Sequence, residues 1–343
     1  MKVLVLNNHV PFVSGGAEEL SRQLVRQLRI AGHEAEEMGI PFSWSPPERL
    51  IDEIVIGRSL RVVNVDRIIA LKFPAYLVEH ERKVIWLLHQ FRQAYDLFDA
   101  GMTEITSDES GDRLRSALRS ADEAAFRGAY KLFAIPGAAS RLSRYHRITS
   151  EVLSSPLNDP ELFFNAGAGD YIFAGGRVNS AKRQALLIEA LKFAPDVKLI
   201  VAGPAESEGT EAELRALAIR HGVADRVKLD IRFLPRSEVA SLVNHCKAAA
   251  YLPFDEDSVG YVTMEAFQAS KPVISTTDAG GVLDIVSNGV TGLVTSPTPK
   301  ALGDAMTTLW SNPELTLKMG EAARQRLDDL DLSWPKTLKK LLA

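Results

Sequence analysis

The segment 251–275, with the sequence YLPFDEDSVGYVTMEAFQASKPVIS, holds the residues of this chain best suited to binding or catalysis. Three consecutive acidic residues at 255–257 follow the apolar run 248–252, which predicts a buried strand. Gly260 and a helix-compatible stretch containing Glu265 come next. Carboxylates at the end of a buried strand suit one of two tasks: holding a divalent metal, or accepting hydrogen bonds from the hydroxyls of a sugar.

A pair of cations forms the second candidate cluster. In the stretch FAGGRVNSAKRQALL, Arg177 and Lys182 lie behind two glycines and flank the start of a predicted helix. A diphosphate needs concentrated positive charge together with free backbone N–H donors, so this junction suits a diphosphate leaving group. The structural alternative is a solvated basic helix start. If these cations neutralise a diphosphate, a metal at 255–257 is redundant, and we expect no metal.

The acidic cluster then divides into two parts. If the helix begins near Gly260, Glu265 projects from its second turn while Asp257 lies in the preceding loop, so both can face one ligand. Asp255 and Glu256 are left as residues of the loop surface. The rival interpretation keeps 255–257 as an Asp-x-Asp site for Mg²⁺ or Mn²⁺.

Short apolar runs alternate with helical patterns along the chain, and these elements must position the candidate residues. The predicted strands lie at 3–6, 67–71, 83–88, 131–135, 171–174, 198–202, 227–229, 248–252, 272–275 and 292–295. Continuous apolar runs of this length are typical of strands buried on both faces, and their alternation with helices indicates an α/β fold of doubly wound parallel sheets. Ligands of such sheets bind beyond the carboxyl ends of the strands.

The length of 343 residues favours two domains of about 150 residues each. Turn residues without sustained periodicity, between 154 and 169, mark the linker. We therefore expect an N-terminal domain at 1–165, a C-terminal domain at 166–325 and, at 326–343, a C-terminal helix that packs back on the first domain. The basic and apolar sequence WPKTLKKLL leaves weak contact with an anionic membrane surface as the alternative for this helix.

Composition excludes several other classes of protein. With 46% hydrophobic and 24% charged residues and a net charge of -4, the chain has ordinary globular composition and no basic excess for nucleic acid. Its one cysteine, Cys246, cannot form an internal disulfide or a cysteine-based zinc site. No apolar run approaches the roughly 18 residues of a membrane span, so we expect a cytoplasmic protein.

Four further positions stand at predicted strand ends or helix starts. Gly15 and Gly16 precede a helical pattern and are candidate contacts for a phosphate or a sugar, with a plain tight turn as the alternative. Gly203 follows a predicted strand in another turn that allows close approach. His89 follows the strand at 83–88 and is either functional or a hydrogen-bonded structural histidine.

Taken in order, these motifs resemble those of the retaining nucleotide-sugar glycosyltransferases of the GT-B fold, specifically glycosyltransferase family 4 (group 1). The matching stretches are GGAE, GGRVNSAK before a leucine-rich helix, the VAG turn, DSVGYVTMEAFQASKPVIS and DAGGVLDIVSNGVTGLV. The resemblance spans nearly the whole chain and is densest from about 171 to 294. It implies two Rossmann-like domains that face each other across a cleft, the first on the acceptor side and the second binding the donor.

The donor contacts that this resemblance implies in the second domain are Arg177, Lys182, Gly260, Tyr261, Val262 and Glu265. The two cations would hold the diphosphate, the backbone amides at the helix start would contact sugar and phosphate, and the Glu265 carboxylate would bind the ribose hydroxyls. In the first domain, Gly16 resembles the glycine of the family's first loop, and His89 resembles the histidine placed near the donor sugar.

The chain departs from the family pattern at three positions. Asp257 stands where the family usually has a Glu that contacts the transferred sugar, and its side chain is one methylene shorter. Asp284 also replaces a common Glu, and Val259 replaces a frequent Phe. These departures affect the expected contacts with the transferred sugar more than the expected nucleotide-binding site.

The resemblance implies a metal-independent and cofactor-free retaining transfer, from a nucleotide-diphosphate sugar to an acceptor hydroxyl, with His89 and Asp257 in catalytic roles. No motif identifies the acceptor, which could be a glycan, a lipid-linked sugar or a small molecule. Arg92 and Tyr95, close after His89, are candidate contacts on the acceptor side. A sugar-nucleotide epimerase, a phosphorylase or a non-catalytic relative that binds nucleotide sugars would share the fold.

Overall fold

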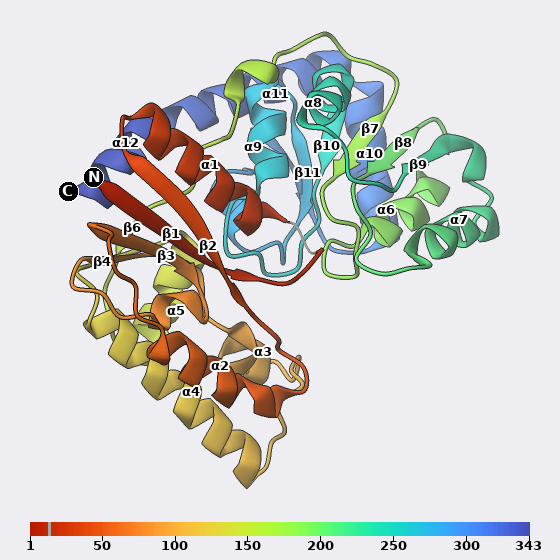
Figure 1. Cartoon of the computed structure of the whole chain (residues 1–343). Coiled ribbons are helices and arrows are strands. Elements are labelled where there is room, and N and C mark those ends of the chain that lie inside the picture. Colours follow the sequence, from red (N-terminus) through yellow and green to blue (C-terminus); the bar gives the residue numbers. More distant parts are fainter. Residues whose placement is uncertain (13–14) are drawn as a thin grey trace. The chain divides into compact units, whose positions relative to one another are not determined.

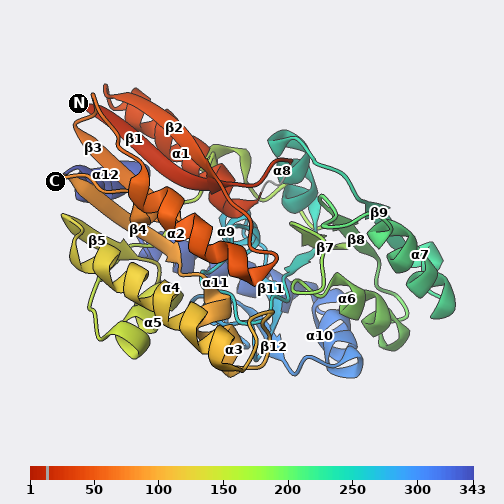
Figure 2. The ribbon, with the colours of Figure 1, turned by 60° about the horizontal axis from the view of Figure 1, so that its bottom comes forward.

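The computed structural model describes residues 1–12 and 15–343, and the chain forms two compact units. The first unit comprises Met1–Pro156 and Ser333–Ala343, and the second comprises Leu157–Leu332. Each unit is built on a six-stranded parallel sheet with helices on both faces, as Figures 1 and 2 show. The prediction of an α/β fold with two doubly wound, Rossmann-like sheets is confirmed.

The sheet of the first unit has the strand order β2-β1-β3-β4-β5-β6, and every neighbouring pair is parallel. Its strands are β1 (Lys2–His9), β2 (Glu34–Pro41), β3 (Arg67–Lys72), β4 (Lys83–His89), β5 (Lys131–Ala134) and β6 (Glu151–Val152). Its helices are α1 (Gly16–Ile30), α2 (Leu50–Ser59), α3 (Asp96–Asp99), α4 (Glu109–Arg127), α5 (Pro136–His146) and α12 (Trp334–Leu342). Helices α1 and α12 cover one face of the sheet, while α2, α4 and α5 cover the other (Figure 1).

Helix α12 is held in the core of the first unit by its apolar face. The ring of Trp334 lies 6.3 Å from that of Trp86 at an interplanar angle of 85°, and Leu341 is fully buried. The Arg67 guanidinium donates a hydrogen bond of 2.9 Å to the carbonyl of Leu341. These apolar side chains are thus buried within the first unit. Every helix in the described ranges is too short or too polar to cross a bilayer.

The sheet of the second unit has the order β12-β11-β10-β7-β8-β9 and is also parallel throughout. Its strands are β7 (Ile172–Gly175), β8 (Leu199–Ala202), β9 (Val227–Asp230), β10 (Ala248–Ala250), β11 (Val273–Thr276) and β12 (Gly292–Thr295). Its helices are α6 (Gln184–Ala190), α7 (Thr210–Arg220), α8 (Arg236–His245), α9 (Tyr261–Gln268), α10 (Pro299–Ser311) and α11 (Pro313–Asp329). Helices α6, α7 and α10 lie on one face, and α8, α9 and α11 lie on the other (Figure 1).

The second unit begins before the predicted boundary at 165. Leu157 and Phe163 are buried in its core. The side chain of Asn244 fixes this entering segment, since its Nδ2 donates to the Leu162 carbonyl at 2.8 Å and its Oδ1 accepts from the Phe164 N–H at 2.9 Å. At the other end of the unit, α11 runs on to Asp329, so the expected C-terminal helix at 326–343 is reduced to α12.

Candidate active site

Strand β7 occupies the point where the second sheet changes its direction of growth. The chain adds β8 and β9 on one side of β7, then returns to add β10, β11 and β12 on the other. Because adjacent connections leave in opposite directions at such a point, a crevice opens beyond the carboxyl ends of the strands, and ligands of open α/β sheets bind there. The predicted donor residues of the second unit lie in the loops at this edge and in α9.

Gly203 lets the loop after β8 approach the loop after β7. A Cβ atom on Gly203 would lie 2.0 Å from the carbonyl oxygen of Gly176, and the φ of Gly203 is +139°. The two loops are also joined by the N–H of Val178, which donates to the Pro204 carbonyl at 2.9 Å. Only glycine fits this close approach, so Gly203 shapes the edge of the site.

The amino end of α9 packs against the same loops. A Cβ atom on Gly176 would lie 3.4 Å from Cγ2 of Val262, which follows Tyr261 in the first turn of α9. Gly260 precedes this helix with a φ of +74° and provides no side-chain cap. First-turn N–H groups of a helix have no intrahelical carbonyl to bond, and together with the helix dipole they favour an anion.

Lys182 forms an ion pair with Glu256 across this edge. Glu256 also accepts a hydrogen bond of 3.1 Å from the Tyr251 hydroxyl, and Lys182 Nζ lies 5.2 Å from the centre of the Tyr251 ring. Burial, reinforced by the negative charge of Glu256, raises the pKa of Tyr251 well above its usual value, so this hydroxyl remains a donor. Asp255 is exposed, as expected, but the assignment of Glu256 to the loop surface is wrong because its carboxylate has these partners.

Arg183, next to Lys182, fastens the carboxyl ends of β10 and β11 to the loop after β7. Its guanidinium donates to the carbonyls of Leu252 and Pro253 at 2.8 Å and pairs with Asp278 at 2.8 Å. Those partners are far from Arg183 in the sequence, so no local sequence motif predicts this role. Arg177 is half-buried after Gly176, which places both predicted cations on one loop.

Glu265 is buried in α9, only 4% exposed, and forms an ion pair with Arg236 at the start of α8. Asp257 is also buried, at 7% exposure, in the loop between Glu256 and α9. The backbone around it is fixed by the N–H of Gly281, which donates to the Glu256 carbonyl at 2.7 Å. Asp257 and Glu265, the two carboxylates predicted to face the ligand, are therefore both buried in the second unit.

In the first unit, His89 lies at the carboxyl edge of the sheet beside Lys72 in the register of β3 and β4. Its Nδ1 is 2.9 Å from the carbonyl oxygen of Gln90, a contact that requires a proton on Nδ1 and leaves Nε2 as an acceptor in the neutral ring. Lys72 is paired at 2.9 Å with Glu18, which lies in the first turn of α1. The sequence did not single out this ion pair.

Gly15 and Gly16 form the start of α1, with Gly15 as its extended N-cap residue at a φ of -157°. Ser14, which precedes Gly15 in the sequence, lies outside the described residues. The Gly15 carbonyl accepts the first helical hydrogen bond, 3.0 Å from the N–H of Glu19. The role of both glycines as donor contacts stays a prediction.

Tyr95 has a structural role, and its assignment as an acceptor contact is wrong. Its side chain is 0% exposed, and its hydroxyl donates to the buried carboxylate of Asp122 at 2.7 Å and lies 2.9 Å from Nε2 of His146. A side chain enclosed in this way cannot touch an acceptor. Arg92 is partly exposed and pairs with Asp96, and its acceptor role stays a prediction.

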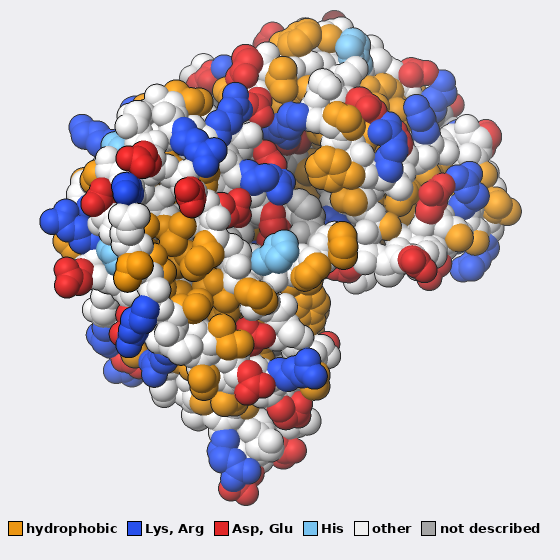
Figure 3. Space-filling view, in the orientation of Figure 1, with side chains coloured by type: hydrophobic (Ala, Val, Ile, Leu, Met, Phe, Trp, Pro, Cys, Tyr) orange, Lys and Arg blue, Asp and Glu red, His pale blue; other side chains and the backbone are white. Residues whose placement is uncertain are grey.

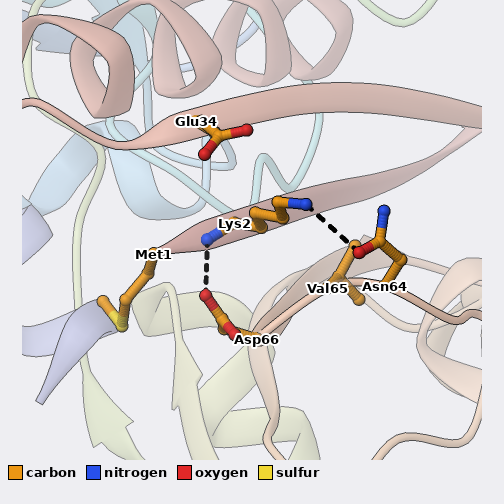
Figure 4. Close-up of a pocket in the computed structure, with 6 residues that line it drawn as sticks. All are labelled: Met1, Lys2, Glu34, Asn64, Val65 and Asp66. Carbon is orange, nitrogen blue, oxygen red and sulfur yellow. Dashed lines mark hydrogen bonds between the residues drawn. The ribbon is translucent and has the colours of Figure 1, made fainter.

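A hollow of about 340 Å³ lies at the opposite edge of the first sheet, at the amino ends of its strands. Figure 4 shows its lining residues: Met1, Lys2, Glu34, Asn64, Val65 and Asp66. Its polar groups bond one another, since the Lys2 N–H donates to Asp66 at 2.7 Å and Lys2 Nζ donates to Asn64 at 3.1 Å. This hollow is at the wrong end of the strands for the ligand of a doubly wound sheet. On the face shown in Figure 3, Lys and Arg side chains are interspersed with Asp and Glu.

The two parallel doubly wound units, the second with cations, glycine loops and a helix start at its strand-reversal point, place the chain in the GT-B class of folds. Residues 162–326, which make up most of the second unit, match the family model described as Glycosyl transferases group 1. The predicted resemblance to group 1 glycosyltransferases is thereby confirmed.

Two curated relatives are both named D-inositol 3-phosphate glycosyltransferase. The one from Jonesia denitrificans is 28% identical over 189 residues, which are 52% of this chain and 43% of that protein. The one from Corynebacterium glutamicum is 34% identical over 175 residues, which are 48% of this chain and 40% of that protein. The chain thus matches less than half the length of these relatives.

Two solved structures share the fold over the whole chain. Sucrose-phosphate synthase from Thermosynechococcus elongatus superposes with a TM-score of 0.76 at 17% identity, covering 99% of this chain and 97% of the other. Anabaena Alr3699/HepE in complex with UDP-glucose superposes with a TM-score of 0.74 at 18% identity, covering 100% and 98%. At these identities the likeness establishes the fold.

Proposed function

We propose that the protein is a retaining, metal-independent glycosyltransferase that moves a sugar from a nucleotide-diphosphate sugar to an acceptor hydroxyl. The observation that carries the proposal is the position of Lys182. Its ammonium group lies at the carboxyl edge of the second sheet, held by Glu256 in the loop that leads to α9. Cations and helix-start amides at such an edge are suited to a diphosphate.

Different residues of the second unit bind different parts of the donor. Lys182 and Arg177 hold the diphosphate and stabilise the charge that develops on it as the glycosidic bond breaks. The first turn of α9, behind Gly260, donates backbone N–H groups to the phosphate and the sugar. Glu265 accepts hydrogen bonds from the ribose hydroxyls, and Asp257 contacts the transferred sugar.

Metal independence is supported by the way the acidic run is dispersed. Asp255 is exposed, Glu256 is paired with Lys182, and Asp257 is buried further along the loop. A divalent ion prefers several oxygen ligands at 2.0–2.6 Å. The run would have to rearrange to supply them, whereas the cations at the same edge already supply positive charge.

Retention of configuration is proposed by resemblance to the family. The acceptor hydroxyl attacks the anomeric carbon from the face that the nucleoside diphosphate leaves, and the departing phosphate oxygen takes the hydroxyl proton. The new bond joins the acceptor oxygen to the anomeric carbon, and the nucleoside diphosphate leaves with the electron pair of the old bond. His89 is proposed as the catalytic residue of the first unit.

Uridine diphosphate sugars are the first donors to examine, because Anabaena Alr3699/HepE shares the fold and was solved with UDP-glucose. The name of the curated relatives makes D-inositol 3-phosphate one acceptor to include. Glycans and lipid-linked sugars complete the acceptor panel.

The experiment measures release of nucleoside diphosphate from UDP-, GDP- and ADP-sugars, with and without each acceptor and with EDTA. The proposal predicts that one nucleotide class turns over, that EDTA leaves the rate unchanged, and that proton NMR finds the donor's anomeric configuration in the product. Inverted product would contradict retention, and loss of activity in EDTA would contradict metal independence. Binding of every nucleotide sugar without turnover would identify a sensor.

A further inference from the structure

Arg236 is the residue that neutralises the buried carboxylate of Glu265. Its guanidinium pairs with Oε1 of Glu265, whose side chain is 5% exposed. A carboxylate in this environment is costly to ionise unless a cation or several donors compensate it. Among the residues that the structure describes, no hydrogen bond reaches Oε2 of Glu265, so one oxygen is held and the other is available to a ligand.

Arg236 is itself fixed by contacts other than the one with Glu265. Its Nη2 donates to the carbonyl of Asn158 at 2.9 Å, and its guanidinium carbon lies 4.7 Å from the centre of the Phe163 ring. Asp159 lies 4.0 Å from its Nε. A planar guanidinium bound at several points has few orientations, and it transmits that restriction to the carboxylate with which it pairs.

We propose that Arg236 is a positioning residue that orients Glu265 toward the ribose and thereby sets the preference for ribonucleotide over 2′-deoxyribonucleotide donors. This rests on the proposed function, in which Glu265 binds the ribose hydroxyls. With Oε1 occupied by Arg236, the Oε2 lone pairs are directed to the ribose, and loss of one hydroxyl leaves part of a buried carboxylate without a donor. Such a loss is more costly than loss of an exposed hydrogen bond.

The alternative role for Arg236 is competition with the ribose for Glu265, and binding measurements distinguish it from orientation. A guanidinium beside the carboxylate could compete with the ribose for it, in which case removing Arg236 would strengthen ribonucleotide binding. The contacts of Arg236 with Asn158, Phe163 and Glu265 fix its position, and this favours orientation over competition.

Calorimetric binding of UDP, GDP and ADP, each beside its 2′-deoxy form, tests the proposal on the full chain. The variants are Arg236→Ala, Arg236→Lys, Glu265→Ala and, as matched control, Arg232→Ala. Arg232 lies in the loop just before α8, is 50% exposed and pairs at the surface with Asp230 and Glu238. Thermal unfolding of each variant reports whether it folds, and Arg236→Lys keeps the charge if Arg236→Ala does not fold.

Wild type and Arg232→Ala should prefer the ribose form of the bound nucleotide about tenfold, as expected for a hydrogen bond to a charged group. Arg236→Ala should reduce the preference to about twofold while affinity for the 2′-deoxy form changes little, and Arg236→Lys should be intermediate. An unchanged preference in folded Arg236→Ala, or tighter ribonucleotide binding, would overturn the proposal. If Glu265→Ala keeps the preference for the ribose form, the ribose site of the proposed function is wrong. If Glu265→Ala loses the preference while Arg236→Ala keeps it, only the role of Arg236 is refuted.

Discussion

Lys182 and Glu256 form an ion pair that joins the loop after β7 to the loop after β10, with side chains 23% and 24% exposed. The cation that the sequence assigns to a diphosphate is therefore already neutralised by a carboxylate of the same unit. Partial burial makes this pair worth more than an exposed one, since solvent screens it less. In the proposed function, a donor diphosphate must displace Glu256 from Lys182 or share the ammonium group with it.

Removing either cation should lower turnover. Lys182→Ala and Arg177→Ala are each expected to reduce kcat about 100-fold or more, because charge on the leaving group would lose a preorganised partner. Lys198→Ala is the control, since Lys198 is 55% exposed and pairs with Asp170 before the amino end of β7. Rates are compared by nucleoside diphosphate release; near-normal rates in both variants would remove the cations from the mechanism.

Replacing Glu256 should strengthen binding of the nucleoside diphosphate. Glu256→Gln keeps a hydrogen-bond acceptor for Tyr251 but removes the charge that competes for Lys182, so affinity for the nucleoside diphosphate should rise about fivefold. Calorimetry at two salt concentrations measures this, and the gain should shrink at high salt. Weaker binding by the variant would show that Glu256 contributes to the donor site directly.

Gly260 and Gly289 provide a matched pair for testing the close contact before α9. Their φ values are +74° and +76°, but a Cβ on Gly260 would lie 2.5 Å from Cε1 of Tyr251, whereas Gly289 has open space around it. Gly289→Ala should lower the free energy of unfolding by about 1 kcal/mol from backbone strain alone. Gly260→Ala adds a steric clash with Tyr251 and should lower the free energy of unfolding by about 3 kcal/mol.

Urea unfolding and donor binding are the two measurements for this pair. Gly260→Ala should also weaken nucleotide binding because the first turn of α9 must move, while Gly289→Ala should bind normally. Equal costs in the two variants would mean that Tyr251 readily gives way.

Asp122 and His146 form a buried pair of titrating groups in the first unit, linked through the hydroxyl of Tyr95. Burial raises the pKa of Asp122 to about 7, so between about pH 4 and 7 the folded state binds a proton that the unfolded state lacks, and stability falls as pH rises. Burial lowers the pKa of His146, so below about pH 6.5 the unfolded state binds the extra proton, and stability falls as pH falls.

These two slopes oppose each other in the wild type and should separate in single variants. Asp122→Asn should leave the histidine effect, with stability falling below about pH 6.5 by up to about 1.4 kcal/mol per pH unit. His146→Gln should leave the aspartate effect, with stability falling from about pH 4 to 7. Urea unfolding across this pH range measures both; parallel curves for the two variants would contradict the assignment.

The sequence predicted most of the fold because buried parallel strands carry continuous apolar runs, as β3 and β4 do. Strand β2 was missed, since it lies at the sheet edge and reads EAEEMGIP, with exposed acidic residues at Glu34, Glu36 and Glu37. An edge strand has one unpaired side and solvent on part of its faces, so polarity does not exclude it.

The candidate site was predictable only where its residues lie close together in the sequence. Arg183, Glu256 and Arg236 were missed because each is defined by partners about 30 to 95 residues away. Tyr95 was misassigned for the related reason that nearness to His89 in sequence does not determine exposure. Only the folded arrangement of strands and loops determines which charges meet.

The central claim is that the second unit binds a nucleotide-diphosphate sugar, and thermal unfolding with UDP, GDP, ADP and their glucose conjugates tests it most directly. A ligand at about 100 times its dissociation constant adds about 2.7 kcal/mol, which should raise the Tm by about 5–10 °C. We predict this rise for one nucleotide class in the wild type and its loss when Arg177 and Lys182 are both replaced by Ala. A Tm unchanged by every nucleotide and sugar nucleotide at millimolar concentration would contradict the claim.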